Sequence, residues 1–365
     1  MSKWRVLFLP LILFMLTVSV GAQETLDRQA ELVGIDALEG SLDMEARDLM
    51  DYDDPTEQRN VISDVVSIFK NAVKNSEGAI KKAVRSMTYI LLIVLAVQLA
   101  EVIIGEKQIQ IAAASGALAI VVFCASDFRT MIGLGKDTLQ EINSFSNALL
   151  PVMVSAATMT GSVTGAGVVY TLSSVFTNLM IRFSNAVLVP AVYAYLGLAL
   201  TDSVTQQERL KQLRELLGWL IEKGLKALVY VFTGFLTVSG IISGAADEAA
   251  VKAAKMTLSG VVPVVGGIIS NAASSVLSSA ALLKNAVGTF GMLSILAIFA
   301  VPFINLGVSY MMFKIVTAIS GIVGSKQAGL LQAIASAMGY ILAMTATCAL
   351  IGLLSCCFLI KAVHI

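Results

Sequence analysis

Charged residues are scarce in this chain: they make up 14% of it, whereas soluble domains contain about 25%. Hydrophobic residues make up 57%, above the roughly 45–50% that is usual for soluble domains. A soluble globular enzyme would carry a larger charged surface. Apolar runs recur along the last three quarters of the chain, and about 20 helical residues suffice to cross a bilayer core about 30 Å thick. The composition therefore predicts an all-α, polytopic membrane protein.

Residues for acid–base and metal chemistry are also few. The single histidine, His364, is next to the last residue, and histidine is the side chain that titrates near neutral pH. The four cysteines lie inside apolar runs, without the spacing of a disulfide framework or a metal cluster (Cys124, Cys348, Cys356 and Cys357). The net charge of zero disfavours nucleic acid as a partner. We therefore expect no catalytic residue, no bound metal and no cofactor.

Phosphate-binding loops are incomplete in this sequence. Such a loop needs glycines and a lysine at fixed spacing, because backbone amides and the ammonium group surround the phosphates. The nearest matches are IGLGKDT (132–138) and GIVGSKQ (321–327). Thr130 and Ile319 stand where their leading glycines belong. We therefore expect that the chain is not an enzyme and that any ATP-driven work belongs to another chain.

The N-terminal part reads as an exported segment. Residues 1–22 are predicted to be a signal peptide, with Lys3 and Arg5 before an apolar run and small residues before Gln23. Residues 23–60 hold twelve acidic and three basic residues. Their leucines are too few for a core, so we expect a short helical or partly disordered spacer, or a dock for a basic partner. The acidic extracytoplasmic segment, 23–86, should end in an amphipathic helix over 61–86.

The membrane domain is expected to fill residues 87–365. One further region, 306–323, is interrupted by Lys314, which brings the expected number of crossings to six to eight. The distribution of basic residues leaves the sidedness of the loops open. The candidate spans lie at about 87–104, 109–126, 147–169, 183–201, 225–244, 288–309 and 336–360.

A segment of this domain, 202–226, is predicted to be an amphipathic helix. Its leucines, such as Leu213 and Leu220, share one face, while charged residues such as Lys211 and Glu215 occupy the other. Such a helix lies at the membrane interface or docks a partner, and a plain connector is the alternative.

Residues 245–287 are predicted to form a polar insert with a broken helix. Pro263, Gly266 and Gly267 interrupt an apolar run, because proline lacks a backbone donor and glycine adds backbone freedom. Broken backbone at membrane depth must be shielded by protein or line a cavity. The stretch is a polar stripe along a conduit, a re-entrant pair of half-helices, or ordinary small-residue packing. The polar residues that follow the break are Ser270, Asn271, Ser274, Ser278, Lys284 and Asn285.

This order of features, and the stretch VKAAKMTLSGVVPVVGGIISNAASSVLSSAALLKNAVG (251–288), resemble the stage III sporulation protein AE family of endospore-forming Firmicutes. The most specific parts are PVVGG (263–267) and LLKNAVG (282–288). The resemblance implies a multi-pass protein of the mother-cell membrane around the forespore. It implies a noncatalytic core component of a secretion-like channel complex. It transfers no catalytic residue and marks these two motifs as a structural core.

The partners that the resemblance implies are other membrane proteins of the same sporulation complex, a separate cytoplasmic ATPase, and a forespore-side partner across the intermembrane space. The alternative function is a secondary transporter or permease for a small solute, with a midplane site at the broken helix 259–288, because discontinuous helices build such sites. Few ionisable residues are available for ion coupling: Glu101, Arg182, Lys284 and Lys314 are the main candidates.

Overall fold

The computed structural model describes residues 38, 40–50, 61–103, 109–160, 163–205, 208–261 and 266–361, with only the backbone course at 109–110, 163–165, 208–209, 239–261, 266–280 and 361. The predicted signal peptide, most of the acidic segment and Pro263 lie outside these residues. Within them the chain is helical, which confirms the all-α prediction. The helices are α3 (Met44–Met50), α4 (Val61–Asn75), α5 (Glu77–Ile103), α6 (Ile109–Met159), α7 (Val163–Phe183), η2 (Ser184–Leu188), α8 (Val189–Thr205), α9 (Glu208–Val261), α10 (Gly266–Ile322) and α11 (Ala328–Lys361).

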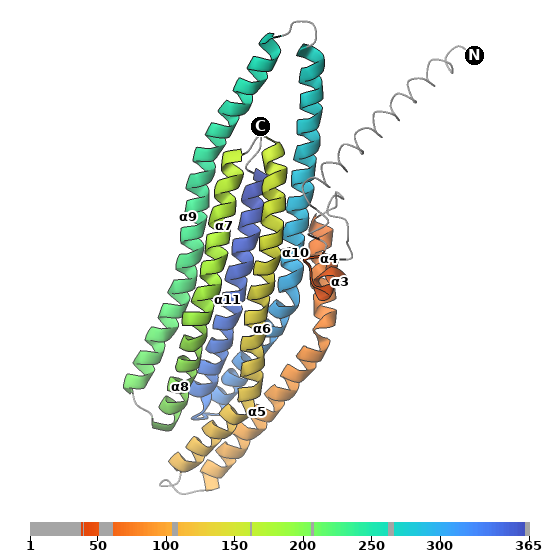
Figure 1. Ribbon diagram of the computed structural model, residues 1–365. Coiled ribbons are helices and arrows are strands. Elements are labelled where there is room, and N and C mark those ends of the chain that lie inside the picture. Colours follow the sequence, from red (N-terminus) through yellow and green to blue (C-terminus); the bar gives the residue numbers. More distant parts are fainter. Residues whose placement is uncertain are drawn as a thin grey trace, which may run out of the picture.

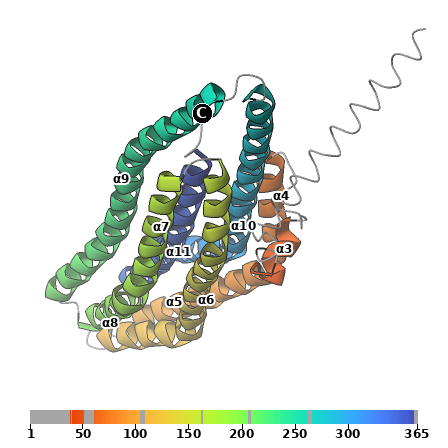
Figure 2. The ribbon, with the colours of Figure 1, turned by 45° about the horizontal axis from the view of Figure 1, so that its top comes forward.

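The long helices run up and down in one bundle, as Figure 1 shows. α5 descends and α6 returns; α7, η2 and α8 descend as one column; α9 rises, α10 descends and α11 rises. α9 forms one edge of the bundle and α3 and α4 form the other in both views (Figure 1 and Figure 2), while α5 runs from α4 along the bottom of the bundle. The tip of the α9–α10 hairpin projects beyond the ends of α6, α7 and α11.

The α10–α11 hairpin is the centre of the bundle. α10 contacts α3, α4, α5, α6, α9 and α11, and α11 also contacts α6, α7, α8 and α9. The most apolar window of α10 is 72% buried, whereas that of α5 is only 11% buried. The described part of the chain therefore leaves the apolar face of α5 uncovered, as is usual for a surface that faces lipid.

Five helices in the described part are long and apolar enough to cross a membrane. The chain is a polytopic α-helical membrane protein. The five candidates are 77–103, 111–159, 166–205, 281–322 and 328–360. The predicted span 225–244 lies in α9, whose side chains from residue 239 onward are outside the described part.

The helices are much longer than a bilayer is thick. α6 has 51 residues and α10 has 57, or about 76 and 85 Å at about 1.5 Å per residue, against a hydrocarbon core of about 30 Å. The prediction of separate spans at 109–126 and 147–169 was wrong in this respect, because one unbroken helix holds 109–126 and 147–159. A single straight helix crosses a bilayer once, so about half of the bundle lies outside the hydrocarbon.

Charges near mid-height divide the bundle into two apolar parts. Lys82 and Arg85 on α5 lie level with Asp127 and Arg129 on α6, since Lys82 and Asp127 form an ion pair. Below this level α6 has no charged residue from 109 to 126, a length of about 27 Å. We call the part that contains α5, α8 and residues 109–126 the α5 half, which lies at the bottom of Figure 1. The opposite part, beside α3 and α4, is the α4 half.

A π-helical turn joins α7 to α8. The N–H of Val189 donates to the carbonyl of Ser184, five residues back. Pro190 follows directly; it has no N–H to donate and its ring would clash with a carbonyl of the preceding turn in a regular helix. The wider turn accommodates proline without ending the column. The two elements therefore act as one span, 166–205.

The predicted break in the 245–287 insert lies between two helices. α9 ends at Val261 and α10 begins at Gly266, with residues 262–265 outside the described part. α9 is one helix from Glu208, so the predicted amphipathic helix 202–226 is largely its first part, while 202–205 end α8. Residues 266–287 continue without interruption into the rest of α10. The C-terminal side of the insert is therefore the start of a long helix and not a separate re-entrant half-helix.

The acidic segment contributes to the core. Leu38, Leu42 and Leu49 are buried, as is Met50, and α3 packs against α4 and α10. The side-chain amide of Asn71 on α4 donates to the carbonyl of Leu49, and the hydroxyl of Ser294 on α10 lies 3.6 Å from the sulfur of Met50. The expectation that these leucines are too few for a core was wrong, because they share the core of the bundle.

Candidate functional site

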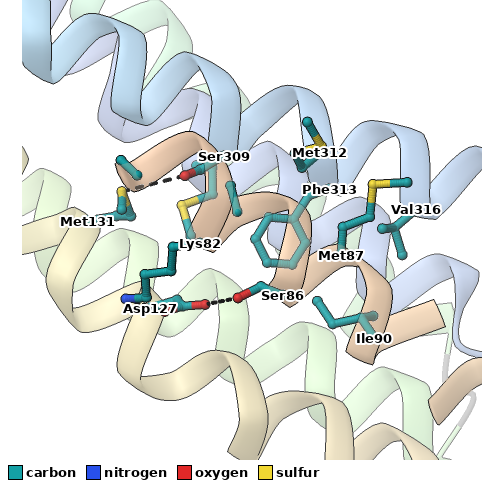
Figure 3. A pocket seen from close by; sticks show the side chains of 13 residues that line it. Lys82, Ser86, Met87, Ile90, Asp127, Met131, Ser309, Met312, Phe313 and Val316 are labelled. Atoms are coloured by element: carbon teal, nitrogen blue, oxygen red, sulfur yellow. Dashed lines mark hydrogen bonds and ion pairs between the residues drawn. The ribbon is translucent and has the colours of Figure 1, made fainter. Parts of the chain in front are cut away.

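An ion pair between α5 and α6 lies at the mid-height boundary of the α5 half (Figure 3). The ammonium group of Lys82 lies 2.8 Å from one carboxylate oxygen of Asp127. The hydroxyl of Ser86, one turn further along α5, donates to the other oxygen at 2.9 Å. Asp127 is 19% exposed and Lys82 56% exposed, so the carboxylate is held inward and the lysine reaches out. The arrangement satisfies the carboxylate at both oxygens and fixes α5 against α6.

A small cavity adjoins this cluster. Its volume is about 40 Å³, and it opens between α5, α6, α10 and α11. Ser309 closes one side, donating to the carbonyl of Asn305, with its hydroxyl 3.7 Å from the sulfur of Met131. The remaining lining includes the apolar side chains of Met87, Phe313 and Val316 (Figure 3). A space of this size holds a few water molecules at most, which is too small for a transported solute of ordinary size.

A second ion pair joins α8 to α9. A guanidinium nitrogen of Arg214 lies 3.2 Å from a carboxylate oxygen of Asp202, and both side chains are mostly buried, at 13% and 18% exposure. Neither this pair nor Lys82–Asp127 was predicted. A signal existed in the sequence: a carboxylate near the end of an apolar span needs a cation within reach. Which of the neighbouring cations supplies it depends on the fold.

The outer face of α9 mixes apolar and charged side chains. Leu213, Leu216 and Leu220 are exposed. The rest of the bundle covers only the inner side of α9, where Ile221 and Leu225 are buried. Beside the exposed leucines the charged side chains remain outside; they are Lys211, Glu215, Glu222 and Lys226, of which Lys226 donates to Glu222.

This face lies at the depth of two candidate spans. A Cβ on Gly218 would lie 2.4 Å from the hydroxyl of Tyr340 on α11 and 3.5 Å from Tyr195 on α8. Both tyrosines belong to candidate spans. Acyl chains would solvate the leucines but not the charges, and water the reverse. The face therefore suits a protein surface that offers both apolar and polar groups.

Two of the predicted site residues can be placed in full. Lys284 is 1% exposed, and its ammonium nitrogen has no hydrogen-bond partner among the described residues. A buried ammonium group needs a carboxylate, a carbonyl or the membrane interface within reach, and neither of the first two is bonded to Lys284 among the described residues. Asn285, the next residue, is exposed. The two side chains therefore point to different surroundings and form no common site.

The other predicted site residues are placed only by their backbone or not at all. Pro263 is outside the described part. The helix α10 begins at Gly266 and carries the rest on its first turns, without described side chains; they are Gly267, Ser270, Asn271, Ser274 and Ser278. The choice between a polar conduit stripe and small-residue packing for this stretch stays a prediction.

Close helix contacts at glycine characterise the next turns of α10. A Cβ on Gly288 would lie 2.4 Å from Ile360 on α11 and 3.1 Å from Met153 on α6. A Cβ on Gly291 would lie 2.4 Å from Leu149 on α6. Absence of a side chain at these positions allows the helices to approach, as is common between membrane helices. Gly288 ends the motif LLKNAVG, so this part of the motif has a packing role.

The described residues offer little for catalysis or metal binding. No group of three His, Cys, Asp or Glu side chains gathers there as a metal site. Cys124, Cys348 and Cys356 are buried free thiols, and the two interhelical ion pairs hold helices together. The arrangement positions helices rather than a reacting group.

Comparison with known proteins gives one family. A sequence model of the family described as "Stage III sporulation protein AE" matches residues 49–362. A curated protein of that name from Bacillus subtilis (strain 168) is 24% identical over 246 residues, which are 67% of this chain and 62% of that protein. The chain thus spans about three fifths of the length of this relative. No solved structure matches.

Proposed function

The chain belongs to the stage III sporulation protein AE family, and we propose that it is the noncatalytic, multispanning core of a secretion-like channel complex that links mother cell and forespore during endospore formation. In this proposal it resides in the mother-cell membrane around the forespore, with its N-terminal segment outside the cytoplasm. Its partners are the other membrane proteins of the complex, a separate cytoplasmic ATPase, and a forespore-side protein across the intermembrane space.

The outer face of α9 is the observation that carries the proposal. Exposed leucines and exposed charges lie side by side there, at the depth of candidate spans. Lys211 and Glu215 lie on the hydrocarbon side of Gly218, which packs beside Tyr195. Burying such charges in lipid costs several kcal/mol or more, so a protein partner is the covering that fits. A chain that needs such a partner on one edge is a component of an assembly.

The interior of the bundle supports a structural rather than a transporting role. The cavity beside Asp127 has room for a few waters, and that carboxylate is already bonded at both oxygens. Solute coupling requires ionisable groups that change partner during a cycle. Both interhelical ion pairs instead connect neighbouring helices, α5 to α6 and α8 to α9.

The test compares two sets of three exposed leucines. Replacing Leu213, Leu216 and Leu220 with alanine alters the outer face of α9; replacing Leu92, Leu95 and Leu99 alters the face of α5, for which we expect lipid. The affinity-tagged chain is purified from sporulating cells, and its co-purifying membrane proteins and the yield of heat-resistant spores are measured. We expect the α9 variant to lose both and the α5 variant to keep both.

Two results would contradict the proposal. One is equal co-purification with the two variants when both melt at the temperature of the unaltered chain. The other is a solute flux in proteoliposomes of the purified chain alone, which favours the transporter alternative.

A further inference from the structure

An open groove runs between α6 and α8 on the outside of the α5 half. Its volume is about 400 Å³, ten times that of the Asp127 cavity and within the usual range of small-molecule sites, about 300–1,000 Å³. Buried residues of α11, Leu330 and Ile334, form its floor. Its walls are apolar: Val121 and Phe128 stand on α6, and Leu196, Gly197 and Leu200 on α8. We call it the α6–α8 groove.

The groove has one polar end. α6 ascends while α8 descends (Figure 1), so the last lining residue of α6, Arg129, and the first of α8, Tyr193, lie toward the same end. Both are exposed. Among the described residues the guanidinium of Arg129 has no carboxylate partner, whereas the nearby Lys82 does. A free cation and a phenol thus stand at the mouth of an apolar slot.

The depth of this end matches a membrane interface. Arg129 follows the ion-paired Asp127 by one turn or less, and below it residues 109–126 are free of charge over about 27 Å. The neighbouring column is free of charge from 183 to 201. The apolar length of the groove therefore lies beside hydrocarbon, and its cation lies where phosphate groups of lipids are found.

We propose that the α6–α8 groove binds one anionic phospholipid, with an acyl chain along the apolar walls and the phosphate at Arg129 and Tyr193. A guanidinium presents several donors that match phosphate oxygens, and the tyrosine hydroxyl adds a donor at the same end. Basic sites between membrane helices bind anionic headgroups by the same chemistry. A zwitterionic lipid places a cation near the arginine and is bound less tightly.

Gly197 is where the acyl chain meets the wall. A Cβ there would meet no atom within 4 Å, so the missing side chain leaves space for a ligand rather than for another helix. A larger side chain fills the groove without a clash in the protein. A loss of lipid binding in such a variant would therefore come from the filled groove and not from a disturbed fold.

The test needs only the full chain purified in detergent. It is incubated with phosphatidylglycerol or with phosphatidylcholine of the same acyl chains, and retained lipid is counted by native mass spectrometry. We expect one phosphatidylglycerol to be retained at least about tenfold more tightly than phosphatidylcholine, because the choline ammonium weakens the attraction between Arg129 and the phosphate that both lipids carry. Arg129→Gln should abolish the preference, and Gly197→Leu should lower retention of both lipids.

Matched controls are Lys223→Gln, an exposed cation on α9, and Gly133→Leu, an open glycine on α6 outside the groove. Both should leave retention unchanged. Equal retention of the two lipids by the unaltered chain overturns the proposal, as does full retention by Gly197→Leu. It is also overturned if Gly197→Leu leaves lipid retention intact but releases a co-purifying membrane protein, since a partner helix would then occupy the groove.

Discussion

At the scale of single residues, glycines decide how closely the helices of this bundle approach. Gly291 and Gly307 lie on the same helix, α10. A Cβ at Gly291 would lie 2.4 Å from Leu149, which is 1% exposed, whereas one at Gly307 would meet nothing within 4 Å. At Gly291 a side chain would therefore disturb the contact between helices, whereas at Gly307 it would change only the helix propensity.

We predict that Gly291→Ala destabilises the protein by about 1–3 kcal/mol, because the packed Leu149 must move. Gly307→Ala should stabilise it by up to about 1 kcal/mol, because alanine favours the helix. Thermal unfolding in detergent, followed by circular dichroism, measures both. Equal shifts for the two variants would show that the helix contact at Gly291 carries no stability.

The Lys82–Asp127 pair yields a second prediction. Asp127→Asn keeps the shape and the bond from Ser86 but removes the charge, and the exposed Lys82 recovers water. We expect a loss of about 1 kcal/mol. The double variant with Lys82→Gln should lose less than the sum of the single ones, because they share one interaction. Lys81→Gln, which breaks an exposed pair with Glu77, is the control and should change the unfolding free energy by at most about 0.5 kcal/mol; strict additivity in the double variant would refute the coupling.

At the scale of elements, the segment around α3 has an apolar pattern whose packing partner lies far away in the sequence. Leu38, Leu42, Ala46 and Leu49 recur at spacings of three and four, and all are buried. The spacing was readable, but the acidic residues around it are typical of a solvated spacer. What covers the leucines is a surface of α4 and α10, the latter more than 200 residues away, and no local pattern reveals it.

If α3 is part of the core, shortening one of its leucines should release it. Leu49→Ala should cost about 2–3 kcal/mol, as for other buried leucines. Met44→Ala, on the exposed side at 77% exposure, should cost less than about 0.5 kcal/mol. Limited proteolysis of the segment before residue 61 gives an independent measurement, with faster cleavage expected only for Leu49→Ala. Cleavage at the same rate in both variants would mean that α3 does not dock.

The turn between α10 and α11 is tied to α6 by the side chain of Gln327. Gly324 adopts a positive φ of 74°, which glycine tolerates best. Gln327 is 1% exposed and donates from its amide to the carbonyl of Ala113 at the start of α6, 3.2 Å away. Ser325 donates to the amide oxygen of the same glutamine. Both polar ends of this buried side chain are thus satisfied.

We predict that Gln327→Leu lowers the free energy of unfolding by about 1–3 kcal/mol, because Ser325 and the Ala113 carbonyl lose their partner. Lys326→Gln, an exposed neighbour, should have no measurable effect. Chemical unfolding monitored by intrinsic fluorescence would compare them. A loss confined to Lys326→Gln would show that the turn is held by charge instead.

At the scale of the whole molecule, composition was enough to predict an all-α membrane protein, and proline and glycine marked the place where α9 gives way to α10. The number and limits of the spans were harder to predict. Charges from 127 to 141 separate two apolar runs in α6, and a reading by hydropathy ends a span there. The helix continues because Asp127 finds Lys82 and Ser86 on another helix. Pairing across helices is a property of the fold and is not visible along the chain.

The exposed side chains also indicate where the bilayer lies along this tall bundle. α5 belongs to one half only, and its exposed Leu95 and Leu99 need hydrocarbon. In the opposite half, exposed Lys70 and Lys74 on α4 need water. We therefore predict that the bilayer surrounds the α5 half. The charged face of α9 at this depth is then covered by protein.

Single cysteines in a chain whose four native cysteines are replaced by alanine test this placement. In opened membrane vesicles, where both faces are accessible, a charged maleimide should label Val66→Cys on α4, which is 61% exposed. It should label Leu99→Cys, at 65% exposure, only after detergent is added, because a charged reagent does not enter hydrocarbon. Because the protein leaves the two positions equally exposed, a difference in labelling must come from the lipid. The reverse labelling pattern would place the bilayer around the α4 half, and Arg129 would then lie outside the interface, which would remove the physical basis of the lipid site.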